Sequence, residues 1–205
     1  MLLRLRAETA ELHRRVETRL FPAALADRTA YAAMLRVLLA LHEPREAQLR
    51  RTPGLPALGI DLAGRRKSPR LRADLTALGT APAPESSAGS ESAGSESAGS
   101  ESGGSGAADD LPAALGTFYV LEGSTLGGRV LLREVRDQLG AVPTAFLHGY
   151  GEETGRMWKQ TRTALVAGVG AAADPDRAAD RLVAGATATF DALDRLLTAS
   201  GWASA

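Results

Sequence analysis

Apolar residues recur every three or four positions along most of this chain, which is the spacing of one face of an α-helix. In residues 2–20 this apolar stripe consists of Leu5, Thr9, Leu12, Val16 and Leu20. No stretch alternates apolar and polar residues as a half-buried strand does. Because aromatic residues make up only 4% of the chain, leucine, alanine and valine must fill the core. The sequence therefore predicts an all-α fold in a single domain.

The same spacing predicts further helices over residues 29–50, 69–78, 111–139, 151–168 and 175–199. Gly140 follows the third of these segments and is expected to end it. Asp174 and Pro175 form a helix start before the last. Residues 53–64 are rich in proline and glycine and are expected to form a loop, and Pro44 is expected to kink the helix that contains it.

Residues 80–108 interrupt the helical pattern. They contain the sequence AGSES three times in tandem, at 88–92, 93–97 and 98–102, and no apolar residue larger than alanine. Such a tract buries too little apolar surface to offset the entropy lost on ordering it. We therefore predict a disordered insertion at 80–108, and one all-helical domain formed by residues 1–79 and 109–205.

The helix predicted over 111–139 contains three glycines in the stretch FYVLEGSTLGGRVL, residues 118–131. Each interior glycine costs roughly 1 kcal/mol relative to alanine, or about 3 kcal/mol for Gly123, Gly127 and Gly128 together. This is a sizeable part of a net stability on the order of 5–15 kcal/mol. Two explanations remain open. Gly123 and Gly127 could let a second helix approach closely, or a flat ligand could lie on the bare backbone.

His13 lies beside the apolar stripe of residues 2–20, with Glu17 one turn later and Arg6 two turns earlier on the same side. A carboxylate at i+4 can hydrogen-bond one ring nitrogen and fix the tautomer. His13 is therefore either an ordinary boundary histidine or a ligand. A metalloporphyrin fits the second alternative, with its iron on the imidazole, its open face on the glycines and its carboxylates on arginines such as Arg129 and Arg133. The other two histidines are weaker candidates: His42 is expected to be structural or exposed, and His148 to lie in a turn.

Two segments together resemble the heme oxygenases: RLRAETAELHRRVE at 4–17 and FYVLEGSTLGGRVL at 118–131. The resemblance is closer to the bacterial branch found alongside bacteriophytochromes. It implies a single all-α domain that clamps heme between a proximal and a distal helix. It also implies an activity, the opening of heme by O₂ and electrons to give biliverdin, CO and Fe²⁺, so that heme is both cofactor and substrate. The implied partners are an electron-donating reductase or ferredoxin and a bacteriophytochrome that accepts biliverdin.

The resemblance also assigns residues. His13 would be the proximal iron ligand, Glu17 the carboxylate that holds it, and Arg6 a propionate-binding cation. The distal helix would place Gly123, Ser124 and Gly127 at the reacting oxygen, with Gly128 beside them. Further propionate-binding bases are expected among Arg156, Lys159 and Arg162, and Phe190 is expected to form a wall of the pocket.

The chain departs from the family pattern at two positions. Well-known relatives carry a water-ordering aspartate where this chain has Ser124, and Leu38 replaces the tyrosine that partners that aspartate. We expect Ser124 and a chain of waters to supply protons instead. The departures keep an alternative open, a protein of the same fold that binds or delivers heme without turnover. A third possibility is a helical interaction domain in which Gly123 and Gly127 pack against a neighbouring helix.

Composition excludes several other classes. The chain has 24 Lys and Arg residues against 24 Asp and Glu, and this zero net charge argues against nucleic acid as the main partner. The absence of cysteine excludes disulfides and thiolate metal sites. No segment approaches the ~20 apolar residues of a membrane span, and the N-terminal segment lacks the apolar core of a signal peptide. We predict a cytoplasmic, monomeric protein with no membrane partner.

Overall fold

The computed structural model describes residues 1–80 and 110–201, and the regular structure of this part is entirely helical. The α-helices are α1 (Leu2–Ala24), α2 (Arg28–Arg51), α3 (Ser68–Ala77), α4 (Asp110–Leu139), α5 (Ala145–His148), α6 (Thr154–Gly170) and α7 (Pro175–Ala199). Two 3₁₀ turns are η1 (Pro56–Leu58) and η2 (Gly151–Glu153). The all-α prediction is confirmed. The predicted insertion at 80–108 lies outside the described residues, apart from Thr80.

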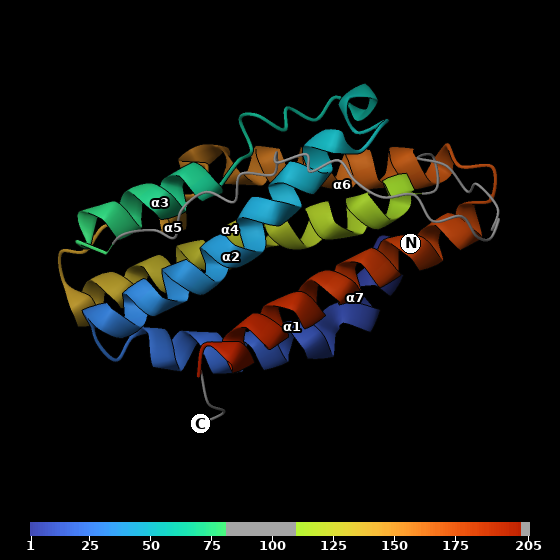
Figure 1. Cartoon of the computed structure of the whole chain (residues 1–205). Helices are drawn as coiled ribbons and strands as arrows, with labels where there is room; N and C mark the ends of the chain where they lie inside the picture. Colours follow the sequence, from blue (N-terminus) through green and yellow to red (C-terminus); the bar gives the residue numbers. More distant parts are fainter. Residues whose placement is uncertain (81–109, 202–205) are drawn as a thin grey trace, which may run out of the picture.

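The helices form two groups with a cavity between them. Helices α1 and α7 lie side by side along one edge of the molecule, and α2, α4 and α6 form the body above them (Figure 1). Helix α4 packs against α7 and α6, and α1 packs against α7 and α2, whereas α1 and α4 make little direct contact with each other. Side chains from both α1 and α4 instead line the cavity described below.

The helix ends follow their sequence signals closely. Asp27 caps α2 by accepting a hydrogen bond from the backbone N–H of Ala30 at 2.8 Å, and Asp174 caps α7 in the same way through Arg177. Gly140 follows α4 with a φ of +68°, a conformation that glycine adopts without a Cβ penalty. Its N–H closes the helix on the carbonyl of Arg136. Pro44 lies inside α2, which continues to Arg51.

Three short elements differ from the predictions. Within the predicted loop 53–64 lies η1, and the predicted helix at 151–168 begins with η2 before α6 starts at Thr154. The four-residue helix α5 was not predicted. Periodicity cannot reveal elements this short, because one helical turn places too few residues on a face.

Two glycines bring α4 and α7 into close contact. A Cβ at Gly116 would collide with the backbone oxygen of Leu182, and a Cβ at Gly185 with that of Ala113. Side chains at these positions would therefore force the two backbones apart. Close helix packing by glycine does occur in this protein, but at Gly116 and Gly185 rather than at Gly123.

Helix α5 is fixed by buried polar groups from α3 and α2. The carboxylate of Asp74 accepts hydrogen bonds from the backbone N–H groups of Ala145 and Phe146, both at 2.8 Å. Just before α5, Tyr31 donates to the carbonyl oxygen of Pro143 at 2.9 Å. The two bonds to Asp74 satisfy N–H donors at the helix start that otherwise have no partner, and the Tyr31 bond satisfies a carbonyl before it. They hold Phe146 and its neighbour Leu147 on the wall of the cavity.

Candidate functional site

A cavity of about 520 Å³ lies between the two groups of helices and has a mostly apolar wall. Helices α1 and α4 supply most of this wall, and α2, α5, α6 and α7 complete it. The volume is within the range of about 300–1,000 Å³ that is typical of small-molecule and cofactor pockets. Of the residues predicted to form the site, the cavity brings together the following: Arg6, His13, Glu17, Leu38, Gly123, Ser124, Gly127, Gly128 and Phe190.

His13 lies on the cavity wall with one ring nitrogen already engaged. Its Nδ1 is 3.4 Å from Oε2 of Glu17, and its ring packs edge-on against Phe190 of α7, with ring centroids 5.9 Å apart. The side chain is 55% exposed, so it is open to a ligand. A histidine that binds a metal typically engages its other ring nitrogen with a carboxylate or carbonyl. The arrangement therefore leaves Nε2 of His13 for a ligand.

The glycines of α4 do not all serve the same purpose. No heavy atom lies within 4 Å of the position that a Cβ at Gly123 would take, so this glycine presents bare backbone to open space. A Cβ at Gly128 would instead lie 3.3 Å from the backbone oxygen of Leu147. Gly128 thus accommodates α5, although it also lines the cavity. For Gly123 the packing explanation is excluded within the described residues, and the bare-backbone explanation fits.

Ser124 and Leu38, where the chain departs from the family pattern, both line the cavity. The hydroxyl of Ser124 donates to the carbonyl oxygen of Leu121 within its own helix, at 2.7 Å. This bond occupies its only proton. Among the lining residues in the described part of the chain, Glu17 is the one carboxylate, so no acid stands in for the aspartate that Ser124 replaces.

The predicted propionate-binding bases are divided by the structure. Arg6 lines the cavity close to Tyr119, which packs against Trp158 of α6 with ring centroids 5.5 Å apart. Burial raises the pKa of Tyr119, and hydrogen bonding to Thr9 and the charge of Arg6 oppose that rise. This end of the cavity is therefore polar and cationic.

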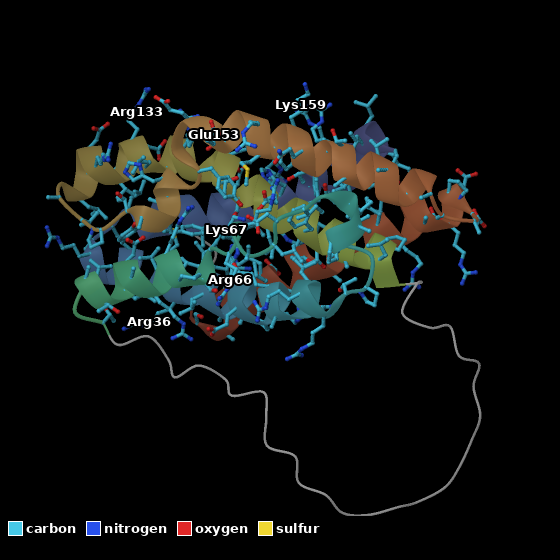
Figure 2. The ribbon with its side chains drawn as sticks, turned by 90° about the horizontal axis from the view of Figure 1, so that it is seen from above. Arg36, Arg66, Lys67, Arg133, Glu153 and Lys159 are labelled. Carbon is cyan, nitrogen blue, oxygen red and sulfur yellow. The ribbon has the colours of Figure 1, made fainter. Side chains whose placement is uncertain are left out.

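Arg156, Lys159 and Arg162 are exposed and do not line the cavity. Arg156 forms an ion pair with Glu153, and Lys159 points away from the body of the molecule (Figure 2). Arg162 follows the cavity-lining Trp158 by four positions, so it shares that face of α6. Arg129 and Arg133 are likewise exposed and outside the cavity wall.

His42 is a cavity residue that the sequence analysis did not assign to the site. It is only 1% exposed, lines the cavity, and packs edge-on against Phe146 of α5 with ring centroids 5.7 Å apart. Of the two expectations for it, structural or exposed, burial excludes the second. Glu46 lies one turn later, as Glu17 does after His13. This repeated spacing is the signal that could have identified His42. His148, in contrast, is exposed at the end of α5, with its Nε2 2.9 Å from Arg136.

A buried charged cluster holds α4 at Glu122, between the cavity-lining residues Leu121 and Gly123. Glu122 accepts hydrogen bonds from Arg65, from Lys67 at 2.5 Å and from the hydroxyl of Tyr150 at 2.7 Å. Burial lowers the pKa of Lys67 and the Glu122 carboxylate opposes this. Figure 2 shows Lys67 among the helices, in contrast to the outward Lys159. The cluster ties the segment before α3 to the cavity-lining part of α4.

The residues present fit a heme. The cavity combines an apolar wall, a histidine with a free ring nitrogen, an open backbone surface at Gly123 and a cationic end at Arg6. Within the described residues no three His, Cys, Asp or Glu side chains gather into a metal site. An iron bound here would thus rely on one protein ligand and on a ligand such as a porphyrin for the rest.

The family model described as heme oxygenase matches residues 1–199 of the chain. The chain belongs to the heme oxygenase family. No curated protein matches it. Membership confirms the resemblance seen at 4–17 and 118–131 and supports a heme-degrading or heme-binding function. None of the helices in residues 1–80 and 110–201 combines the length and hydrophobicity needed to cross a membrane.

Proposed function

We propose that this member of the heme oxygenase family cleaves heme with O₂ and electrons to give biliverdin, CO and Fe²⁺. The observation that carries the proposal is that His13 of α1 and Gly123 of α4 line the same cavity. The histidine is held by Glu17, and the backbone of α4 at Gly123 faces open space. A heme-binding protein without turnover needs the histidine but has no need of the bare backbone.

Each residue has a part in this proposal. His13 binds the iron through Nε2, and Glu17 orients the ring by facing Nδ1. Arg6 would receive a propionate, and Arg162, one helical turn after the cavity-lining Trp158, is the best placed of the three α6 bases to receive the other. Phe190 fixes the His13 ring by edge-on contact.

The bound heme would supply O₂ activation at its iron, and the protein decides where that chemistry is directed. Gly123 and Gly127 would leave room for a small ligand on the heme, because both line the cavity without a side chain. A neutral imidazole such as that of His13 would donate less electron density to iron than a thiolate does. A histidine ligand would therefore favour O–O cleavage less strongly than a thiolate ligand. In this proposal heme is the substrate that is oxidised, and Arg6, through its contact with a propionate, would fix the rotation of that substrate in the cavity.

The proposal extends to the electron donor, the acceptor of the product, and the location and assembly state of the protein. Electrons come from a reductase or ferredoxin, the product passes to a bacteriophytochrome, and the protein acts in the cytoplasm as a monomer. The sequence predicts Ser124 with a chain of waters as the proton supply, but the hydroxyl proton of Ser124 is engaged by the carbonyl of Leu121. Ser124 therefore serves better as an acceptor of a water's hydrogen bond than as a donor.

One observation favours the alternative, a heme-binding or heme-delivery protein without turnover. Glu17, beside His13, is the single carboxylate on the described cavity wall. If turnover required a carboxylate on the O₂ side of the cavity, this chain would bind heme without degrading it.

A reconstitution experiment decides between these functions. Heme is added to the purified chain without oxygen, and reductant and air are then supplied while absorbance is recorded. We expect a Soret band that decays as biliverdin absorbance rises. His13→Ala abolishes turnover, and Glu17→Ala lowers it by about 10–100-fold, the usual cost of losing the group that orients a metal ligand.

His148→Ala is the matched control, because His148 lies outside the cavity and should leave turnover unchanged. A stable Soret band without biliverdin would favour the heme-binding alternative. Full activity in His13→Ala would contradict the assigned iron ligand.

A further inference from the structure

His42 is the cavity residue whose polar atoms are least explained by the protein itself. Among the cavity-lining side chains in the described part of the chain, it alone has buried nitrogens without a hydrogen-bond partner, and this holds for both Nδ1 and Nε2. A buried polar atom left unpaired costs about 1–3 kcal/mol. Such a cost in a ligand cavity points to a partner that arrives with the ligand or with water.

The surroundings of His42 fix its chemical state. Its Nδ1 is 3.7 Å from Oε1 of Glu46, beyond hydrogen-bond length but close enough for the carboxylate to face that nitrogen. Burial lowers the pKa of His42, and Glu46 opposes the change. The ring is therefore neutral at pH 7. Its one proton is favoured on Nδ1, which faces the negative charge, and Nε2 is then an acceptor.

Glu46 is itself firmly held. Its Oε1 accepts from the backbone N–H groups of Lys67 at 2.7 Å and Ser68 at 3.1 Å, and its Oε2 accepts from the hydroxyl of Ser68 at 2.6 Å. Burial alone would raise the pKa of Glu46, but its contact with His42 and these hydrogen bonds lower it to about 2. A permanent charge in a fixed place thus orients the imidazole of His42.

The two cavity histidines belong to different walls. His13 packs against Phe190 of α7, whereas His42 packs against Phe146 of α5, the helix that also contacts Gly128 of α4. His42 therefore lies on the side of the cavity formed by α2, α4 and α5. This is the side on which the proposed function puts O₂.

We propose that His42, oriented by Glu46, is a positioning residue that hydrogen-bonds a water molecule on the O₂ side of the cavity. The water donates one hydrogen bond to Nε2 of His42, and its second O–H donates a hydrogen bond to a small ligand bound at the iron. This inference rests on the proposed heme site. It adds a second acceptor for an ordered water beside Ser124, whose own proton is engaged by Leu121.

Fluoride binding to the ferric heme complex tests the proposal without turnover. Fluoride is a small anion that binds ferric heme and accepts hydrogen bonds, so its affinity reports donors in the cavity. In His42→Leu the water loses its anchor, and we expect fluoride affinity to fall about fivefold, the size of one lost hydrogen bond. His42→Gln, which keeps a polar group of similar reach, should restore most of the affinity. If His42→Leu fails to fold, His42→Gln is the variant whose fluoride affinity is measured.

Four outcomes would overturn the inference. Unchanged fluoride affinity in His42→Leu would show a purely structural histidine. Where only His42→Gln folds, a loss of about fivefold in that variant, which keeps a polar group, would contradict the water anchor. An equal loss in the control His148→Leu would show a nonspecific effect. A loss confined to Ser124→Ala would make the serine the anchor.

The titration separates this inference from the proposed function. It needs only heme binding, so a chain that binds heme without forming biliverdin still tests His42. Conversely, normal turnover with unchanged fluoride affinity in His42→Leu would remove the inference and leave the enzyme assignment intact.

Discussion

His13 and His42 share one local pattern, a glutamate one helical turn later, but the fold places them in different surroundings. His13 is half-exposed at the cavity, with Nδ1 3.4 Å from Glu17. His42 is buried against Phe146, and its glutamate is held by Lys67 and Ser68 at the start of α3. The spacing predicts that a carboxylate can reach the ring. It does not predict burial, which depends on contacts with distant helices.

Burial of His42 makes stability depend on pH. The charged groups that face it are Glu46 on its own helix, Lys67 before α3 and Glu122 on α4. Because the pKa of His42 is lowered below 6.5 in the folded chain, the unfolded chain binds the proton more readily as pH falls. Folded stability is therefore greatest above pH 6.5 and decreases below it. Glu46, with a pKa of about 2, loses its own contribution only below about pH 4.5.

We therefore predict that acidification from pH 7.5 to 5.5 costs the heme-free chain about 1 kcal/mol more than it costs His42→Leu, since one proton gives at most about 1.4 kcal/mol per pH unit. Urea unfolding at several pH values measures this difference. His148→Leu is the control and should follow the unchanged chain, because His148 is exposed. Parallel pH curves for the unchanged chain and His42→Leu would refute the prediction.

At the scale of the helices, glycine has two opposite uses. Gly116 and Gly185 allow α4 and α7 to touch through their backbones, whereas Gly123 leaves space for a ligand. The sequence predicts α4 and its glycines, and the cost of about 1 kcal/mol for each interior glycine is the same for all of them. Which glycine meets a helix and which meets a cavity depends on the partner helix. No pattern within α4 alone contains that information.

Two alanine substitutions distinguish these uses. Gly123→Ala should stabilise the heme-free chain by about 0.5–1 kcal/mol, because alanine favours the helix and its Cβ meets nothing within 4 Å. Gly185→Ala should destabilise it by about 1–3 kcal/mol, because its Cβ collides with the backbone of Ala113. Denaturant unfolding gives both values. Effects of the same sign would contradict the assigned roles.

Connections between helices were the least predictable elements. The segment that contains Arg65 and Lys67 looks like a polar loop in the sequence, yet both side chains are buried on Glu122. A cavity of about 20 Å³, room for one water, lies beside this cluster and is also lined by Glu46. Sequence patterns predict charged loop residues to be solvated. These are buried because α4 and α6 bring compensating partners from far along the chain.

The whole molecule is organised around the separation of α1 from α4. Their partners α2, α6 and α7 support the two helices at a distance, and the cavity occupies the space between them. Periodicity and the two family-like segments predicted the helices and the residues on them. The cavity's volume and its cationic end depend on how α5 and α6 dock. Neither helix carries enough pattern to predict that docking, which is why Trp158 and Phe146 were not assigned to the site.

This arrangement predicts how heme stabilises the chain. A ligand that binds only the folded state adds about 2.7 kcal/mol at 100 times its Kd, so heme should raise the Tm. The apolar wall contacts the ring whether or not iron is present, whereas His13 contributes only with iron. We therefore expect metal-free protoporphyrin to raise the Tm equally in the unchanged chain and in His13→Ala, and the additional rise given by iron protoporphyrin to disappear in His13→Ala. Thermal unfolding with each porphyrin measures this, with His148→Ala as the control. If His13→Ala kept the full additional rise, the iron would be held by another residue, and the orientation of the heme between α1 and α4 would have to be reversed.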